Sequence, residues 1–532
     1  MSSVCKVLLF GSLVLLFLSP LALADETSGG QSWQIHGNSE TIFGWHDVVG
    51  KSDGNLYEGT TGRQELSLHL SKQLTKGRTG LDLRGRATND EQVDTSKAKL
   101  LLIHGYWQQD RINFEFGDVA GSYNPLVLSA SVKGVKLNYR TGTRDHGMDY
   151  TFIGGLQKAS WEELYDSRKD TSVDRYIGGL NGVWTHAPAQ SIGATFSVIK
   201  DDSTTTDGTD PAKATTGGMD WKWRFNRYVS FKGETAYTHT DLNSEDNESA
   251  DNAWGVRMRL LTKPLPRSVR SNFSYERLDP DYKPVVASAS SDRERFENDT
   301  EWMINRQFRL RTTLKYSHDN LDNQLVDTLT TREGVLYLTY RPDWLKRSDL
   351  GLRAQFKTDN GRGSDKYMQV DEINFNFRPK SGWRYGVSYI FTNINDDSTS
   401  GEDQQINTLR GTIGWKKRFS EDRMIRTTVQ LDGHLINRDS GDQQSYGGRI
   451  DFGYDAGNLW STDLSAGTKN SYNDSSPDNT YVNYQFRANY HPGEDRSKAI
   501  RLTAERREYD SDDINSPDYQ EHIVKLSYLF AF

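Results

Sequence analysis

Charged side chains of both signs recur at a spacing of two along much of the chain. Their types and pattern are suited to selecting ions or binding a charged partner. Lys222 and Arg224, for example, alternate with Trp221, Trp223 and Phe225. Alternate residues of an extended strand share one face. A face of this kind would carry a field that selects ions or seats a charged partner; the alternative is a solvated wall without selectivity. The residues predicted to face a lumen are Lys222, Arg224, Lys232, Glu234, Arg309, Arg311, Lys315, Arg353, Lys357, Arg501, Glu505 and Arg507.

Patterns typical of catalysis or metal binding do not occur. The 11 histidines are scattered without metal-ligand spacing, and no G-x-S-x-G motif or phosphate-binding loop is found. Neighbouring Asp and His residues, as at Asp145-His146 and His318-Asp319, are frequent by chance. We therefore expect no catalytic, cofactor-binding or metal-binding residue, and we expect that the protein is not an enzyme.

The N-terminal stretch reads as a secretory signal. Lys6 precedes an apolar run from Val7 to Leu18, and Ala22-Leu23-Ala24 has the small residues of a signal-peptidase site. The run is short for a transmembrane helix, which needs about 20 apolar residues. Cleavage near Ala24 would remove Cys5, the only cysteine. The mature chain would then form no disulfide, no thiolate-bound iron–sulfur cluster and no C-x-x-C-H haem attachment.

Composition separates the chain from globular and disordered proteins. Only 35% of residues are hydrophobic, yet 11% are aromatic and 46 are glycine. Disordered chains are poor in aromatic residues, whereas a barrel with one face in lipid and the other in water combines low mean hydropathy with many aromatic residues. The net charge of −8 is not that of a nucleic-acid-binding protein, and we expect no nucleic acid partner.

Alternating segments predict the fold. Leu66, Leu68 and Leu70 alternate with polar residues, as do Phe114 and Phe116, which is the period of half-buried strands. We expect about 26 such strands (roughly 22 to 28), joined by links that are alternately short and long. This pattern predicts an all-β fold: a transmembrane antiparallel up-and-down barrel over residues 25–532, following a signal peptide at 1–24, with no N-terminal plug domain.

The last strand supports a membrane location. Val524, Leu526, Tyr528, Phe530 and Phe532 share one face to the very end of the sequence. Lipid would cover this stripe if the strand paired with the one near residues 33–45 and closed the barrel. The stripe resembles the C-terminal signal by which the barrel-assembly machinery recognises outer-membrane proteins, and that resemblance assigns the barrel-closing role to Leu526, Tyr528, Phe530 and Phe532.

One connecting segment is unusually apolar. Residues 117–134 have an apolar centre, in contrast to the Asp-, Ser- and Thr-rich loops elsewhere, and residues 284–291 are a weaker second case. Such a segment would fold into the lumen or dock a partner; alternatively, it pairs as an extension of the flanking strands. The candidate lumen or docking residues are Tyr123, Asn124, Pro125, Leu126, Val127 and Leu128.

A plug-free chain with about 26 alternating strands and a terminal Phe resembles the barrel component of porin–cytochrome electron conduits of the Mtr/Pio type. The resemblance implies a sheath in the outer membrane of a Gram-negative bacterium, in contact with lipid and lipopolysaccharide. Its partners would be periplasmic and extracellular multihaem cytochromes, so the haem would belong to the partners and none would be bound by the barrel. The alternative function is a porin or channel for passive or selective solute diffusion.

Overall fold

The computed structural model describes residues 32–532 except 51–57, 95, 144, 159, 165–172, 203–209, 245–249, 266–267, 288–290, 324–326, 399–400, 458, 475, 494–496 and 513–517. The predicted signal peptide lies outside the described residues.

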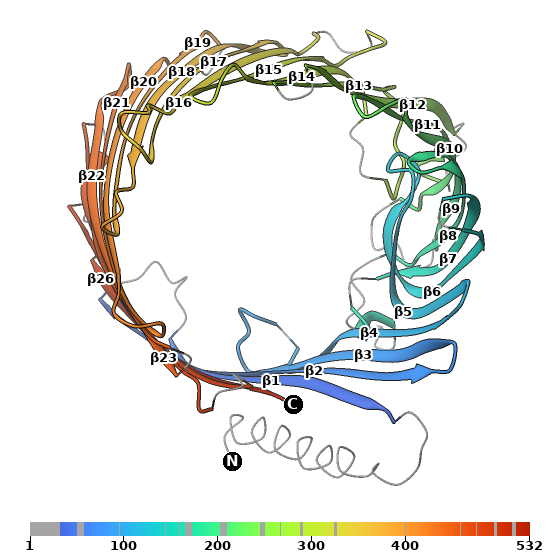
Figure 1. Ribbon diagram of the computed structural model, residues 1–532, viewed down its shortest axis with the longest axis horizontal. Coiled ribbons are helices and arrows are strands. Elements are labelled where there is room, and N and C mark those ends of the chain that lie inside the picture. The colour runs from blue at the N-terminus through green and yellow to red at the C-terminus, as the bar shows by residue number, and fades with distance from the viewer. Residues whose placement is uncertain are drawn as a thin grey trace.

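One antiparallel sheet of 26 strands closes on itself as a ring (Figure 1). The predicted fold class and strand number are confirmed. The strands are β1 (Gln34–Gly50), β2 (Gly59–Leu74), β3 (Gly77–Thr88), β4 (Ala98–Gln109), β5 (Ile112–Ser122), β6 (Ser129–Gly142), β7 (Gly147–Gln157), β8 (Arg175–Ala187), β9 (Gln190–Asp201), β10 (Lys213–Arg224), β11 (Val229–Asp241), β12 (Asp251–Leu265), β13 (Val269–Leu278), β14 (Arg293–Met303), β15 (Phe308–His318), β16 (Thr330–Tyr340), β17 (Ser348–Gly361), β18 (Ser364–Phe377), β19 (Trp383–Asp396), β20 (Gln404–Arg418), β21 (Arg423–Arg438), β22 (Gln443–Ala456), β23 (Trp460–Asn473), β24 (Ser476–Tyr490), β25 (Lys498–Ser511) and β26 (Tyr519–Ala531).

The barrel closes where β26 pairs with β1. The register runs from Asn38 opposite Ala531 to Gly50 opposite Tyr519. Beyond the last strand residue, Phe532 and Gly37 exchange two backbone hydrogen bonds of 2.9 and 2.8 Å. No strand edge is left unpaired at the seam, as a membrane-spanning sheet requires.

Alternation divides each strand into an apolar outer face and a more polar inner face. Phe152 on β7 lies opposite Leu180 on β8, which lies opposite Phe196 on β9, and all three side chains are exposed. Exposed aromatic residues also gather at strand ends, where outer-membrane barrels place their interfacial girdles. At the end of the barrel where β1 begins and β26 ends (the terminus end), these include Trp223, Trp302, Trp344, Trp383 and Trp460; at the opposite end, they include Trp45, Tyr176, Trp254, Tyr446 and Tyr472.

Connections differ between the two ends of the barrel. At the terminus end, most are tight, such as 75–76, 110–111 and 188–189, whereas the opposite end has longer segments such as 158–174 and 279–292. An exception at the opposite end is the two-residue turn 362–363, where both residues have positive φ, as tight hairpin turns require. Among the described residues, no helix is long and apolar enough to cross a membrane; a 3₁₀ turn, η1 (Glu162–Leu164), follows β7.

Candidate functional site: the lumen wall and its inner layer

The tip of the β5–β6 hairpin forms an inner layer against the barrel wall. The two strands pair up to Ser122 opposite Ser129, so residues 117–122 and 129–134 extend the strands, which is the alternative that the sequence left open. The tip, residues 123–128, lies inside the ring (Figure 1), and Leu126, Val127 and Leu128 are completely buried. The apolar composition of this tip is explained by its burial against the wall.

Small side chains of the wall form the surface against which the tip packs. The inner face carries a row of register partners from β8 to β12, namely Gly179, Ser197, Thr216, Thr238 and Ala253. A Cβ atom at Gly179 would lie 2.4 Å from a methyl carbon of Leu128. Larger residues in this row would leave no room for the second layer.

Two further glycines on the same face receive other parts of the inner layer. A Cβ atom at Gly218 would lie 2.6 Å from a methyl carbon of Val127, and one at Gly255 would lie 2.9 Å from the ring of Tyr282. Each glycine thus leaves the space that a buried side chain occupies. The wall of β8 to β12 is complementary in shape to the segments that cover it.

Hydrogen bonds fix the tip in place. The Asn124 side-chain amide donates to the carbonyl oxygens of Met219 (3.1 Å) and Thr235 (3.2 Å), on neighbouring wall strands. The Ser197 hydroxyl donates to the carbonyl of Val127 at 3.2 Å. Backbone carbonyls buried away from water need such partners, and here the tip and the wall supply donors to each other.

Residues 279–287, in the connection between β13 and β14, are the second part of the inner layer. Tyr282 is completely buried and Val286 nearly so, and the Val286 carbonyl accepts a hydrogen bond from the Ser129 amide at 3.0 Å. The Tyr282 hydroxyl donates to the Leu126 carbonyl at 2.5 Å. Burial raises the pKa of Tyr282 well above the ordinary tyrosine value, so the phenol stays neutral and remains a donor.

Replacing Tyr282 by phenylalanine tests how much this hydrogen bond contributes. Tyr282→Phe keeps the ring but leaves the buried Leu126 carbonyl without its donor, and we expect unfolding to become easier by about 1 to 2 kcal/mol. The measurement is guanidinium unfolding of the detergent-folded barrel. The matched control is Tyr237→Phe, because the Tyr237 hydroxyl bonds Asn252 on an exposed surface (2.6 Å). Equal effects of the two substitutions would contradict the assignment.

Beside the inner layer, the wall carries a ladder of ion pairs. Glu234, Arg257 and Glu276 are register partners on β11, β12 and β13, and Arg257 bridges both carboxylates at 3.0 and 2.6 Å. Glu276 also pairs with Arg293 at 2.5 Å. Glu234 was among the predicted lumen residues; Arg257 and Glu276 were not, because strand neighbours depend on register.

Most of the other predicted lumen cations also have polar partners. Arg309 pairs with Glu301 (3.2 Å), Arg311 with Asp299 (2.7 Å), Lys315 with Glu333 (2.9 Å), Arg353 with Glu372 (3.9 Å), Lys357 with Asp359, and Arg507 with Glu505 (2.7 Å). Arg501 donates to the Asn489 side chain at 2.8 Å. Lys222, Arg224 and Lys232 form no ion pair with a described residue. The predicted set therefore divides into a neutralised majority and an uncompensated group on β10 and β11.

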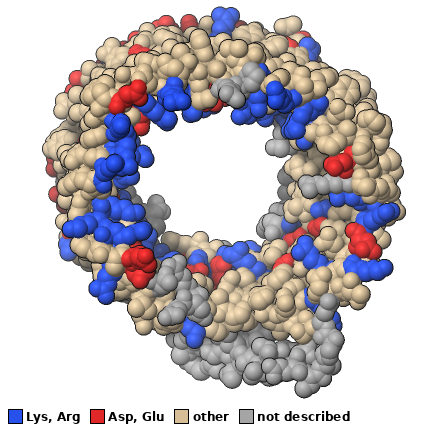
Figure 2. Space-filling model, viewed as in Figure 1, with Lys and Arg blue, Asp and Glu red and all other residues tan. Residues whose placement is uncertain are grey.

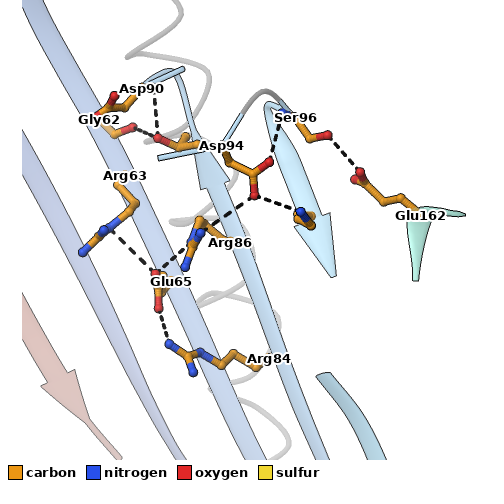
Figure 3. A network of polar contacts seen from close by, with 11 residues as sticks. Gly62, Arg63, Glu65, Arg84, Arg86, Asp90, Asp94, Ser96 and Glu162 are labelled. Atoms are coloured by element: carbon orange, nitrogen blue, oxygen red, sulfur yellow. Dashed lines mark hydrogen bonds and ion pairs between the residues drawn. The ribbon is translucent and has the colours of Figure 1, made fainter. Parts of the chain in front are cut away.

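Two polar networks on β2 to β6 were not predicted. Around Glu65, Arg84 and Arg86 converge at 2.7 and 2.9 Å, and a further hydrogen bond joins Ser96 to Glu162 at 2.9 Å (Figure 3). The Ser96 bond joins the β3–β4 connection to η1, and Asp94 ties that connection to the wall through Arg86 (3.8 Å) and Lys99 (3.4 Å). The sequence shows that these residues are charged, which does not identify their partners.

The second network is a string of titratable residues across β2 to β6. Asp82 contacts His69 (2.5 Å) and His104 (3.3 Å), and Glu115 contacts His104 (3.5 Å) and Lys136 (3.3 Å). Within the described part of the chain, no group of three or more His, Cys, Asp or Glu is arranged to hold a metal ion. The string joins five neighbouring strands through side-chain contacts.

Comparisons with known proteins find structural similarity only at low sequence identity. No protein-family model and no curated protein matches the chain. Among solved structures, it is similar to the translocation pore of the P pilus usher PapC (10% identity, TM-score 0.37, covering 94% of this chain and 99% of that one). It is also similar to the siderophore receptor PirA from Pseudomonas aeruginosa (12%, 0.40, 94% and 81%) and to OccAB2 from Acinetobacter baumannii (12%, 0.36, 68% and 98%). The closed 26-stranded sheet itself shows that the chain is a large β-barrel.

Proposed function

We propose that the protein is a sheath in the outer membrane of a Gram-negative bacterium, with a partner protein in its lumen, and that this partner is a multihaem cytochrome. The wall is wide enough for one, since 26 strands at a spacing of about 4.8 Å and a tilt of about 40° give a diameter on the order of 50 Å. The inner layer is centred on the arc of β7 to β13. Figure 2 shows an open centre bounded by charged side chains.

The open width is the observation that carries the proposal. A water-filled hole of this size would make the envelope leaky, so the barrel is better suited to hold an occupant. The only cysteine is Cys5, so covalently attached haem would belong to the partner. In this arrangement the start of β1, the end of β26 and the tight turns lie on the periplasmic side, lipid and lipopolysaccharide contact the outer face, and assembly requires the barrel-assembly machinery.

Copurification tests the sheath function. The barrel is tagged at a connection of the opposite end and isolated from detergent-solubilised outer membranes. We expect a stoichiometric partner band and haem absorbance in the same fraction. A tagged unrelated porin from the same membranes is the control. Recovery of the barrel alone, without haem absorbance, would contradict the sheath function.

The second candidate function is a selective channel. Its support is the inner layer, which narrows the lumen on one side, and the Lys and Arg residues that gather along the inner rim (Figure 2). Single-channel recordings of the isolated barrel separate the two functions. An empty sheath should conduct strongly with weak ion preference, whereas a selective channel should show a small conductance and a clear preference for anions.

A further inference from the structure

We propose that Lys222, Lys232 and Arg259 form a docking row for an acidic protein surface that enters the lumen from the terminus end of the barrel. The proposal rests on the proposed function, because it names the chemistry of the partner's contacting face. It concerns residues that no described carboxylate neutralises, and it follows from register, pairing and spacing.

Register places the docking row on the inner face. Lys222, Lys232 and Arg259 are direct register partners on β10, β11 and β12. Four residues before Lys222 on β10, on the same face, is Gly218, which the buried inner layer covers. Because alternate residues of a strand share a face, the docking row lies on the same side of the wall as the inner layer, facing the lumen.

Three successive sets of register partners on the inner face of β10, β11 and β12, here called rungs, differ in what contacts them. The first rung, Gly218 with its partners, lies beneath the inner layer. The second contains Asp220, Glu234 and Arg257; Arg257 pairs with Glu234 at 3.0 Å, and Asp220 forms no ion pair with a described residue. The docking row is the third rung, and all its side chains are exposed. Arg259 donates to the neutral amide oxygen of Asn272 at 2.6 Å, and no ion pair joins any of the three to a described residue.

Three like charges in direct register are unfavourable in an empty barrel. Opposite charges on neighbouring strands stabilise a sheet, and like charges destabilise it. On the same face, Lys315 and Arg311 have carboxylate partners at 2.9 and 2.7 Å, so the wall elsewhere neutralises its cations. An external carboxylate cluster would relieve the repulsion in the docking row.

Spacing favours a protein surface over a small anion. The docking row crosses three strands, so its outer members are separated by about 10 Å. One inorganic anion would contact one or two of these cations, whereas several carboxylates on an acidic surface would contact all three. The ammonium and guanidinium groups also lie on the lumen side of the wall, away from the lipid that surrounds the outer face.

Block of the isolated barrel by poly-L-glutamate in planar bilayers tests the docking row. We expect block when the polymer is added at the terminus end, weakening with salt as exposed ion pairs do. In K222Q/K232Q/R259Q, we expect the half-blocking concentration to rise about tenfold. The matched control, R311Q/K315Q/R353Q, removes the same charge from paired positions of the same face. We expect little change there.

Two results would overturn the proposal: unaltered block in K222Q/K232Q/R259Q, or equal weakening in both triple variants, which would indicate a general field. Heat-modifiable mobility on gels verifies assembly, and Lys232→Gln, at the centre of the docking row, replaces the triple variant if assembly fails. The assay needs no natural partner. If copurification fails but the triple substitution in the docking row still weakens block, the proposed function alone is rejected. If copurification succeeds but that substitution leaves block unaltered, the docking row alone is rejected.

Discussion

Replacing Gly179 by valine is expected to force the tip of the β5–β6 hairpin off the barrel wall. A Cβ atom at this position would lie 2.4 Å from Leu128 and 3.0 Å from Ile153, and both neighbours are completely buried. Overpacking of this kind costs about 1 to 3 kcal/mol. At about 2 kcal/mol, the population with a displaced tip would rise roughly thirtyfold.

The neighbouring residue provides the control for this substitution. A Cβ atom at Gly178 would meet nothing within 4 Å, and this residue points to the opposite face of the same strand. We expect Gly178→Val to be neutral or slightly stabilising, because valine favours strands.

Two measurements follow the displaced tip. Limited proteolysis should cut residues 123–128 faster in Gly179→Val than in Gly178→Val, and single-channel conductance should rise. Deletion of residues 121–131 should raise conductance in the same way, because the tip lies in the lumen. If the Gly179 and Gly178 variants gave identical proteolysis and conductance, the position of the tip would not depend on the small side chains of the wall beneath it.

The barrel wall could be predicted from the sequence because the alternation of apolar and polar residues is visible within each strand. The alternation of Leu66, Leu68 and Leu70 with polar residues needs no partner strand to be interpreted. The β5–β6 hairpin is the opposite case. Its apolar tip indicated a special environment, but only the small residues of strands far along the chain, such as Thr216 and Ala253, show what covers it. Those residues have no distinctive period of their own.

Charge pairing was beyond prediction for a related reason. A shift of one residue in register turns every side chain to the other face, so partners such as Glu234 and Arg257, which lie on different strands, cannot be named before the register is known. The sequence did indicate which parity of β10 is polar. It did not indicate that Lys222 would lie opposite Lys232, which is the observation behind the docking row.

Removing Phe532 is expected to weaken barrel closure. The residue exchanges two backbone hydrogen bonds with Gly37, and its ring stacks on Phe530 with centroids 5.6 Å apart. Loss of these contacts would cost about 2 to 3 kcal/mol and leave the end of β1 unpaired. The amount of heat-modifiable barrel in outer membranes measures this effect. Accumulation equal to that of the wild type would contradict a role for Phe532 in closure.

Gly37 allows a stricter test, because it separates contact at the seam from recognition by the assembly machinery. A Cβ atom at Gly37 would lie 2.6 Å from the Phe532 ring and 2.9 Å from the Ser67 carbonyl, so we expect Gly37→Val to displace the ring. If the ring acts mainly by packing at the seam, Phe532→Ala should partly restore stability in the double variant, giving a coupling of about 1 kcal/mol between the two sites. If the ring acts mainly as a recognition signal, Phe532→Ala should change stability in detergent little, and the double variant should be no more stable than Gly37→Val. Unfolding of barrels refolded in detergent, where no assembly machinery is present, distinguishes these cases, because only packing contributes there.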